Sequence, residues 1–258
     1  MEIIKNMKLI IGCLLTLMLT NGYSQLRNPY EGTSWSQFSS IISSLGIATL
    51  STHILNRDLT GGQILSKSPL LWDQNFHSQY NQGYETASNT VPWLNVVFLV
   101  PSVRDERVFE DIMLYAEAVS WSAAVNMSVR AIKLWPRPLV HNDQSGPHKG
   151  EAYGSFYSGH ASNSFAFATA FVHRQYHVHP HSKSNIWWAS GAYLIASLTS
   201  STRVLSGKHY PTDVIVGALM GSSISYLLME YRSIDDQKKS QIGPVMMSPK
   251  FIQMSFSF

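Results

Sequence analysis

Long stretches of apolar residues at helical spacing constrain the fold of this chain more than any other feature. Within 109–133, Ile112, Tyr115 and Val119 recur every three or four positions, with acidic residues off that face. Comparable segments lie at 36–56, 71–86, 91–102, 106–134, 159–177, 185–203 and 211–232. Short loops rich in Pro, Gly, Asn and Asp separate them, and only 250–258 has an alternating pattern typical of a strand. We therefore expect an all-α fold, a helical bundle of about six to seven helices.

The N-terminus is typical of a secretory signal peptide. Lys5 and Lys8 precede an apolar run at 9–19, and small or polar residues follow it. The expected organisation is a signal peptide at 1–24, a linker at 25–35, an α-helical domain at 36–235 and a C-terminal tail at 236–258. We therefore expect a bacterial protein exported to the periplasm or cell envelope.

Composition excludes several classes of site and partner. Cys13 is the only cysteine and lies in the expected signal peptide, so the exported chain has no disulfide or thiolate metal site. The net charge of +3 comes without a basic stripe or tail, so we expect no nucleic-acid partner. Histidines cluster at 173, 177, 179 and 181 without metal-ligand spacing, and we interpret them as a solvated loop.

Two of the apolar segments raise the question of membrane contact. Residues 186–201 and 214–228 are uncharged, but they contain several Ser, Thr or Gly residues. Each is shorter than the roughly 20 residues that cross a bilayer as a helix. We expect these two segments and 159–177 to form the buried core of a soluble bundle. Peripheral or integral membrane contact is the alternative, and the oligomeric state is left open.

The segment from Thr202 to Asp213 contains a candidate nucleophile. Arg203 and His209 flank a turn with Gly207, and Asp213 follows four residues after His209. At that spacing the carboxylate can bond one imidazole nitrogen and leave the other free to attack an electrophile. Such a pair taken alone is more often structural. Its function therefore depends on the neighbouring segments.

Two earlier segments carry groups suited to an anion. Ser158, Gly159 and His160 stand at an expected helix start, where free N–H groups and the positive helix end attract negative charge. His160 could there deliver a proton to a leaving alkoxide. Arg130 and Arg137 lie near the end of the preceding helix, and guanidinium groups bind phosphate oxygens bidentately. Together the segments supply what phosphoryl transfer through a histidine requires.

In their order and spacing, the three segments resemble the signature of the type-2 phosphatidic acid phosphatase (PAP2) and vanadium haloperoxidase superfamily. That signature is Lys-x6-Arg-Pro, then Pro-Ser-Gly-His, then Ser-Arg-x5-His-x3-Asp. The match covers 130–213, and the expected helices extend the resemblance over roughly 90–232. Residues 25–90 have no specific match.

Three positions depart from the pattern. Arg130 occupies the lysine position, Tyr157 replaces proline and Thr202 replaces serine. Arg130 keeps the positive charge with a different geometry, and Lys133, one turn on, is the alternative cation. The change at Tyr157 removes loop rigidity without removing a catalytic atom.

The resemblance implies a metal-independent phosphatase without a cofactor. In it, His209 forms a phosphohistidine, Asp213 orients His209, and His160 protonates the leaving group and later activates water. The phosphate would be held by Arg130, Arg137, Arg203, Ser158 and the Gly159 N–H group. The substrate would be a phosphate monoester or pyrophosphate, lipid-linked, isoprenoid or small and soluble, and vanadate could bind as an inhibitor.

Two other functions remain as alternatives. A vanadate-dependent haloperoxidase would use the same anion site with vanadate as cofactor. A non-catalytic envelope protein would keep the fold without the reaction. The intact set of His160, His209 and Asp213 favours the phosphatase over the second alternative.

Overall fold

The computed structural model of the chain is almost entirely helical. It describes residues 33–57, 64–65, 68, 70, 73, 80–104, 108–141 and 150–241. Within these ranges there is no strand, so the expected all-α class is confirmed. The expected signal peptide, most of the linker, and residues 242–258 with the alternating segment lie outside the described part of the chain.

The helices follow the apolar segments closely in the second half of the chain. The order is α2 (Thr33–Arg57), α4 (Gln82–Thr90), the 3-10 helix η1 (Val91–Leu99), α5 (Val100–Arg104), α6 (Val108–Ala131), α7 (Pro138–His141), η2 (Gly150–Tyr153), α8 (Gly159–Val178), α9 (Asn185–Leu205) and α10 (Pro211–Gln241). The expected helix at 91–102 is a 3-10 helix followed by a short α-helix. Of the helix expected at 71–86, the described residues include Asp73, which is helical, and α4, which begins at Gln82 after its N-cap Asn81. α10 runs past residue 235 without a break.

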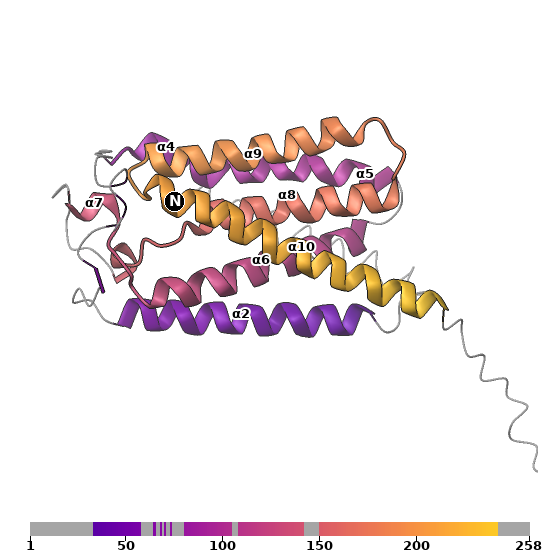
Figure 1. Cartoon of the computed structure of the whole chain (residues 1–258), viewed down its shortest axis with the longest axis horizontal. Coiled ribbons are helices and arrows are strands. Elements are labelled where there is room, and N and C mark those ends of the chain that lie inside the picture. The colour runs from indigo at the N-terminus through magenta and orange to yellow at the C-terminus, as the bar shows by residue number, and fades with distance from the viewer. Residues whose placement is uncertain are drawn as a thin grey trace, which may run out of the picture.

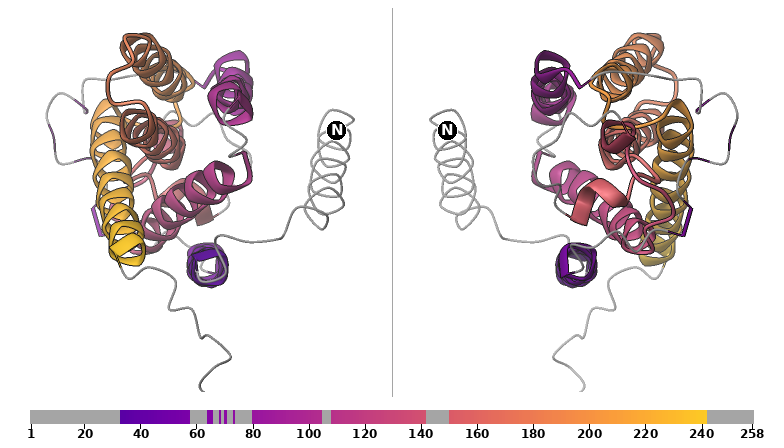
Figure 2. Two further views of the ribbon diagram at one scale, coloured as in Figure 1. Left: turned by 90° about the vertical axis from the view of Figure 1, so that its right-hand side faces the viewer. Right: turned by 90° about the vertical axis from the view of Figure 1, so that its left-hand side faces the viewer.

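α8 lies at the centre of the bundle. It packs against α6, α9 and α10, while α2 lies outside and packs against α6, as the end-on views in Figure 2 show. Small residues such as Ala168 and Ala192 let the helix axes approach closely, and Phe98, Tyr115 and Phe171 fill the remaining space. The central position of α8 explains why its small residues Ala161, Ala166, Ala168 and Ala170 are fully buried.

The two ends of the bundle differ in which helices begin and end there. α6 and α9 end where α8 and α10 begin, and α4 and α7 lie at this same end, on the left in Figure 1. The positive ends of α8 and α10 therefore point to one place. At the opposite end, Arg174 Nε donates to Asp111 Oδ1 at 2.9 Å, and Arg232 Nε donates to the buried Glu117 at 3.0 Å. These ion pairs join α6 to α8 and to α10.

The bundle covers most of the apolar side chains of α8 but leaves many of those on α9 and α10 exposed. Large apolar side chains are exposed on α9 and α10, Trp187, Leu194, Leu219 and Leu227 among them. Two helical stretches, Gln37–Asn56 and Pro211–Ser233, are long and apolar enough to cross a membrane, and only 17% and 33% of their most apolar windows are buried. The expectation that these segments are buried is therefore wrong for their outer faces, because hydropathy does not reveal which face of a helix a neighbour covers.

Because α10 packs closely on α8, alanine substitutions at two glycines should have opposite effects on the stability of the protein. A Cβ on Gly221 would lie 2.0 Å from the carbonyl oxygen of Ser162, whereas nothing lies within 4 Å of a Cβ on Gly46. Alanine favours a helix interior over glycine by about 1 kcal/mol. We therefore expect Gly46→Ala to stabilise the protein slightly and Gly221→Ala to destabilise it by about 2 kcal/mol or more. Thermal unfolding of both variants in one detergent tests this, and equal shifts would contradict the packing.

Candidate active site

His209 lies in the loop between α9 and α10, beside the carboxylate expected to orient it. Gly207 has φ 70°, a conformation that favours glycine, and turns the chain between the two helices. Nδ1 of His209 lies 3.4 Å from Oδ2 of Asp213. The same oxygen accepts hydrogen bonds from Ser155 Oγ at 2.5 Å and from the Tyr210 N–H at 3.1 Å. The carboxylate is thus held in place beside the imidazole.

The surroundings of His209 keep its imidazole neutral. Burial, followed by the charges of Arg137 and Arg203, lowers the pKa of His209 well below its usual 6.5. A neutral imidazole has one nitrogen with a lone pair, and Asp213 faces Nδ1. Nε2 is therefore the atom suited to nucleophilic attack.

The three arginines of the expected anion site are all buried. Nε of Arg130 donates to the carbonyl oxygen of Gly154 at 2.9 Å, and Nη1 of Arg203 donates to Ser88 Oγ at 2.8 Å. Burial is the main cause that lowers the pKa of Arg130 to about 9 and that of Arg203 to about 10. Both remain cationic near neutral pH. Arg137 is buried as well, at 6% exposed.

The start of α8 is shaped by tight contacts with α6 and α10. The Ser158 N–H donates to the carbonyl oxygen of Asp213 at 2.9 Å, and Nδ2 of Asn126 donates to the carbonyl oxygen of Tyr157 at 2.7 Å. A Cβ on Gly159 would lie 2.7 Å from Oδ1 of Asn126, so only glycine fits there. These bonds hold the first N–H groups of α8 beside His209.

Several polar atoms from the three segments have no hydrogen-bonding partner among the described residues. They are Nε of Arg137, Nε of Arg203 and Oγ of Ser158, all buried. Buried polar groups in proteins nearly always have partners. Unpartnered donors from separate segments, with two helix starts beside them, fit an oxyanion with several acceptor atoms.

His160 is the second residue of α8 and is half-buried. Its Nε2 lies 2.9 Å from Oδ1 of Asn89 in α4. Burial, followed by the charges of Arg203, Arg137 and Arg130, lowers the pKa of His160 to about 3. The imidazole is therefore neutral at ordinary pH in the absence of an anion, although the expected role requires a proton.

Arg130 and Lys133, the two candidate cations at the end of α6, differ in their position relative to the histidines. The charge of Arg130 is one cause of the lowered pKa of both His160 and His209, so its guanidinium lies near both histidines. Lys133 lies just beyond the helix end with φ 54°, and its carbonyl oxygen accepts a hydrogen bond from the Ile64 N–H. These positions favour Arg130 as the member of the cationic group.

Sequence reasoning missed the residues that hold the site together. Asp73 accepts a hydrogen bond from the Thr212 N–H at the start of α10, at 3.3 Å. Ser88 and Asn89, both on α4, contact Arg203 and His160. Asn126 was detectable as a lone amide in an apolar helix, but the α4 and Asp73 contacts join segments without local sequence spacing.

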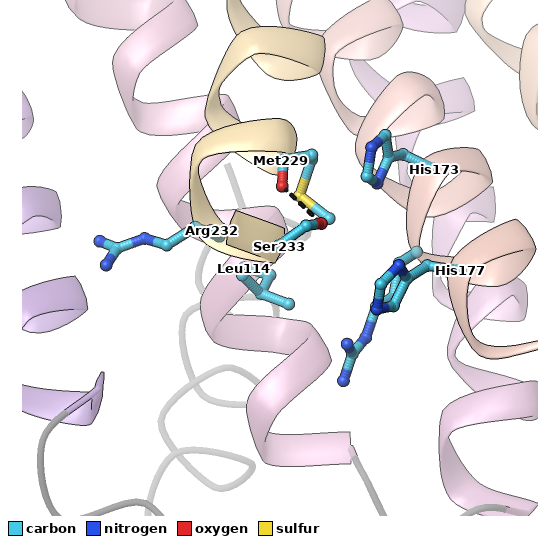
Figure 3. A pocket seen from close by; sticks show the side chains of 7 residues that line it. Leu114, His173, His177, Met229, Arg232 and Ser233 are labelled. Atoms are coloured by element: carbon cyan, nitrogen blue, oxygen red, sulfur yellow. Dashed lines mark hydrogen bonds between the residues drawn. The ribbon is translucent and has the colours of Figure 1, made fainter. Parts of the chain in front are cut away.

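The histidines of 172–182 lie at the far end of the bundle. His173 and His177 point from α8 into a small pocket, while the guanidinium of Arg232 points away from them, as Figure 3 shows. Nε2 of His173 lies 3.1 Å from Oε1 of Glu230. No group of three or more His, Cys, Asp or Glu in the described ranges is placed to hold a metal ion.

Comparisons with known proteins agree with the signature. The family model described as the PAP2 superfamily matches residues 112–235. Over 78 residues the chain is 35% identical to a lipid A 1-phosphatase of Porphyromonas gingivalis. That match spans 30% of this chain and only 16% of the relative. No solved structure matches the chain.

Proposed function

The chain belongs to the PAP2 superfamily, and on that premise we propose that it is a phosphatase acting through a phosphohistidine intermediate. The observation that carries the proposal is the convergence, at one end of the bundle, of His209 and its carboxylate, three buried arginines and the starts of α8 and α10. Positive charge on several sides of one nucleophile is what transfer of a dianionic phosphoryl group requires.

In the first step, Nε2 of His209 attacks phosphorus. The P–N bond forms as the bond to the leaving oxygen breaks, and His160 transfers a proton to that oxygen. The guanidinium groups of Arg130, Arg137 and Arg203 offset charge on the non-bridging oxygens, so the reaction needs neither a metal ion nor a cofactor.

In the second step, water attacks the phosphohistidine. The new P–O bond forms as the P–Nε2 bond breaks, and the bonding electron pair returns to Nε2, so phosphate and neutral His209 are released. His160, now neutral, accepts a proton from the water. Asp213 stabilises the imidazole with its proton on Nδ1 throughout both steps. The same histidine thus serves as acid and then as base.

Anion binding is expected to protonate His160. Burial is the main cause of its pKa of about 3, and the charges of Arg203, Arg137 and Arg130, which a bound dianion would offset, lower it further. The pKa then rises, so at pH 6 binding of sulfate should take up as much as about one proton. Calorimetry in buffers of different ionisation enthalpy measures this uptake. His160→Gln should bind sulfate without it, and equal uptake in both proteins would contradict the assignment.

The substrate proposed is a phosphorylated lipid of the cell envelope, reached by an exported, membrane-associated enzyme. The support is the exposed apolar surface of α2 and α10 and the named activity of the partial relative, a lipid A 1-phosphatase. Partition of the expressed protein into detergent rather than buffer is the expected behaviour. Quantitative recovery from buffer alone would favour a small soluble phosphate ester.

A phosphate-release screen tests the function. The panel contains lipid A 1-phosphate, prenyl pyrophosphates, phosphatidate, phosphatidylglycerol phosphate and nucleotides, each with and without vanadate. We expect metal-independent release from at least one lipid and inhibition by vanadate. Phosphate binding without release from any member would instead support a non-catalytic protein, and vanadate-dependent halide oxidation would support a haloperoxidase.

A further inference from the structure

The helix α4 lies outside the residues that match the family model, yet it contacts the candidate active site. Nε2 of His160 and Oδ1 of Asn89 are 2.9 Å apart. A carboxamide oxygen only accepts hydrogen bonds, so Nε2 carries the hydrogen and donates it to Asn89. One nitrogen of the expected proton donor is therefore occupied by a residue of α4.

Asn89 is held firmly relative to both histidines, because α4 is tied to the site at several points. Oδ1 of Asn81 accepts from the Gly83 N–H at 2.9 Å and caps the helix, while the Asn81 N–H donates to the carbonyl oxygen of Ser206 at 3.3 Å. Immediately before Asn89, the hydroxyl of Ser88 accepts a hydrogen bond from Nη1 of Arg203 at 2.8 Å. A helix fixed in this way can set the direction of an imidazole that it bonds.

A second contact joins α4 to the loop that carries His209. Glu85 forms an ion pair of 3.0 Å with Lys208, and Lys208 also lies over the ring of Tyr80, 5.0 Å from its centroid. α4 therefore spans from the His160 side of the site to the His209 side. Displacement of α4 would move the proton donor relative to the nucleophile.

We propose that Asn89 is a positioning residue for His160, which it holds so that Nδ1 faces the leaving oxygen. The inference rests on the proposed phosphatase function. In the protonated imidazole both nitrogens carry hydrogen, and the bond from Nε2 to Asn89 leaves Nδ1–H for transfer. As the P–O bond breaks, this proton moves to the leaving oxygen. In the second step Nδ1 takes a proton from the attacking water.

Dependence on the leaving group distinguishes this role from general support of the fold. Protonation helps a poor leaving group strongly and a good one little. With phenyl phosphate, Asn89→Ala should lower kcat/KM about 10- to 100-fold, part of the contribution of a general acid. With p-nitrophenyl phosphate, whose added nitro group makes the leaving phenol more acidic, the loss should be about threefold or less.

Two further variants serve as controls. Asn89→Asp keeps an acceptor oxygen at the same place and should recover most of the loss with phenyl phosphate. Thr90→Ala alters the neighbouring residue, whose hydroxyl donates to the carbonyl oxygens of Thr86 and Ala87 in its own helix, and should leave activity with both substrates unchanged. Equal losses with both substrates in Asn89→Ala, or no loss, would overturn the proposal.

A measurement without turnover separates failure of this inference from failure of the proposed function. Nitrogen-15 spectra of the imidazoles should place hydrogen on Nε2 of His160 in the unmodified protein and a tautomer mixture in Asn89→Ala. An unchanged tautomer would overturn the positioning role even if activity fell. Absence of hydrolysis in the unmodified protein, with the expected spectra, would refute the phosphatase function alone.

Discussion

His209→Ala is expected to lower phosphatase activity by about 10⁴-fold or more while leaving the bundle folded. The size follows from removal of the atom that forms the covalent intermediate, since the residual rate comes only from binding and charge stabilisation. His209 is 1% exposed, in a loop and not in the hydrophobic cluster around α8, so the fold should tolerate its truncation. Phosphate release with the best substrate of the screen measures the loss.

The control is His181→Ala, which removes an exposed histidine in the loop between α8 and α9. It should keep full activity. Alkaline quenching during turnover should recover phosphohistidine from the unmodified protein and none from His209→Ala. Full activity of folded His209→Ala would show that another group attacks phosphorus.

Much of the fold was predictable because helices and apolar periodicity share one repeat. The bounds of α6, α8 and α9 fall within about three residues of the apolar segments that predict them. The region before α6 was less predictable, since Pro92 and β-branched neighbours suit a 3-10 helix as readily as an α-helix. The exposure of apolar side chains on the outer helices was not predictable, because a sequence shows that a helix has an apolar face but not whether protein or lipid covers that face.

Only part of the candidate site was predictable from the sequence. His209 and Asp213 are joined by local spacing, and Ser158 to His160 by a helix start, so sequence could predict both pairs. The contacts of Asn89 with His160 and of Ser88 with Arg203 cross 71 and 115 residues of chain. No local pattern encodes such contacts, because they depend on how α4 packs against α9 and reaches His160 at the start of α8.

Asp213→Asn is expected to reduce activity by about 10³- to 10⁴-fold. An amide is nearly the same size as the carboxylate, so the buried site should remain packed, yet it can present a donor to Nδ1 of His209 and favour the wrong tautomer. Hydrogen would then lie on Nε2 and block attack on phosphorus. The expected signature is a large fall in kcat/KM with sulfate binding kept, because the three arginines are untouched.

Ser155→Ala separates the charge of Asp213 from its hydrogen bonds. The Ser155 hydroxyl donates to Oδ2 of Asp213 at 2.5 Å, and the Tyr210 N–H donates to the same oxygen. Loss of the hydroxyl leaves the carboxylate opposite His209, so activity should fall only about tenfold, the effect of one hydrogen bond to a charged group. If Ser155→Ala were as damaging as Asp213→Asn, the position of the carboxylate would matter more than its ability to accept a hydrogen bond from Nδ1 of His209. The tautomer argument for Nε2 attack would then be wrong.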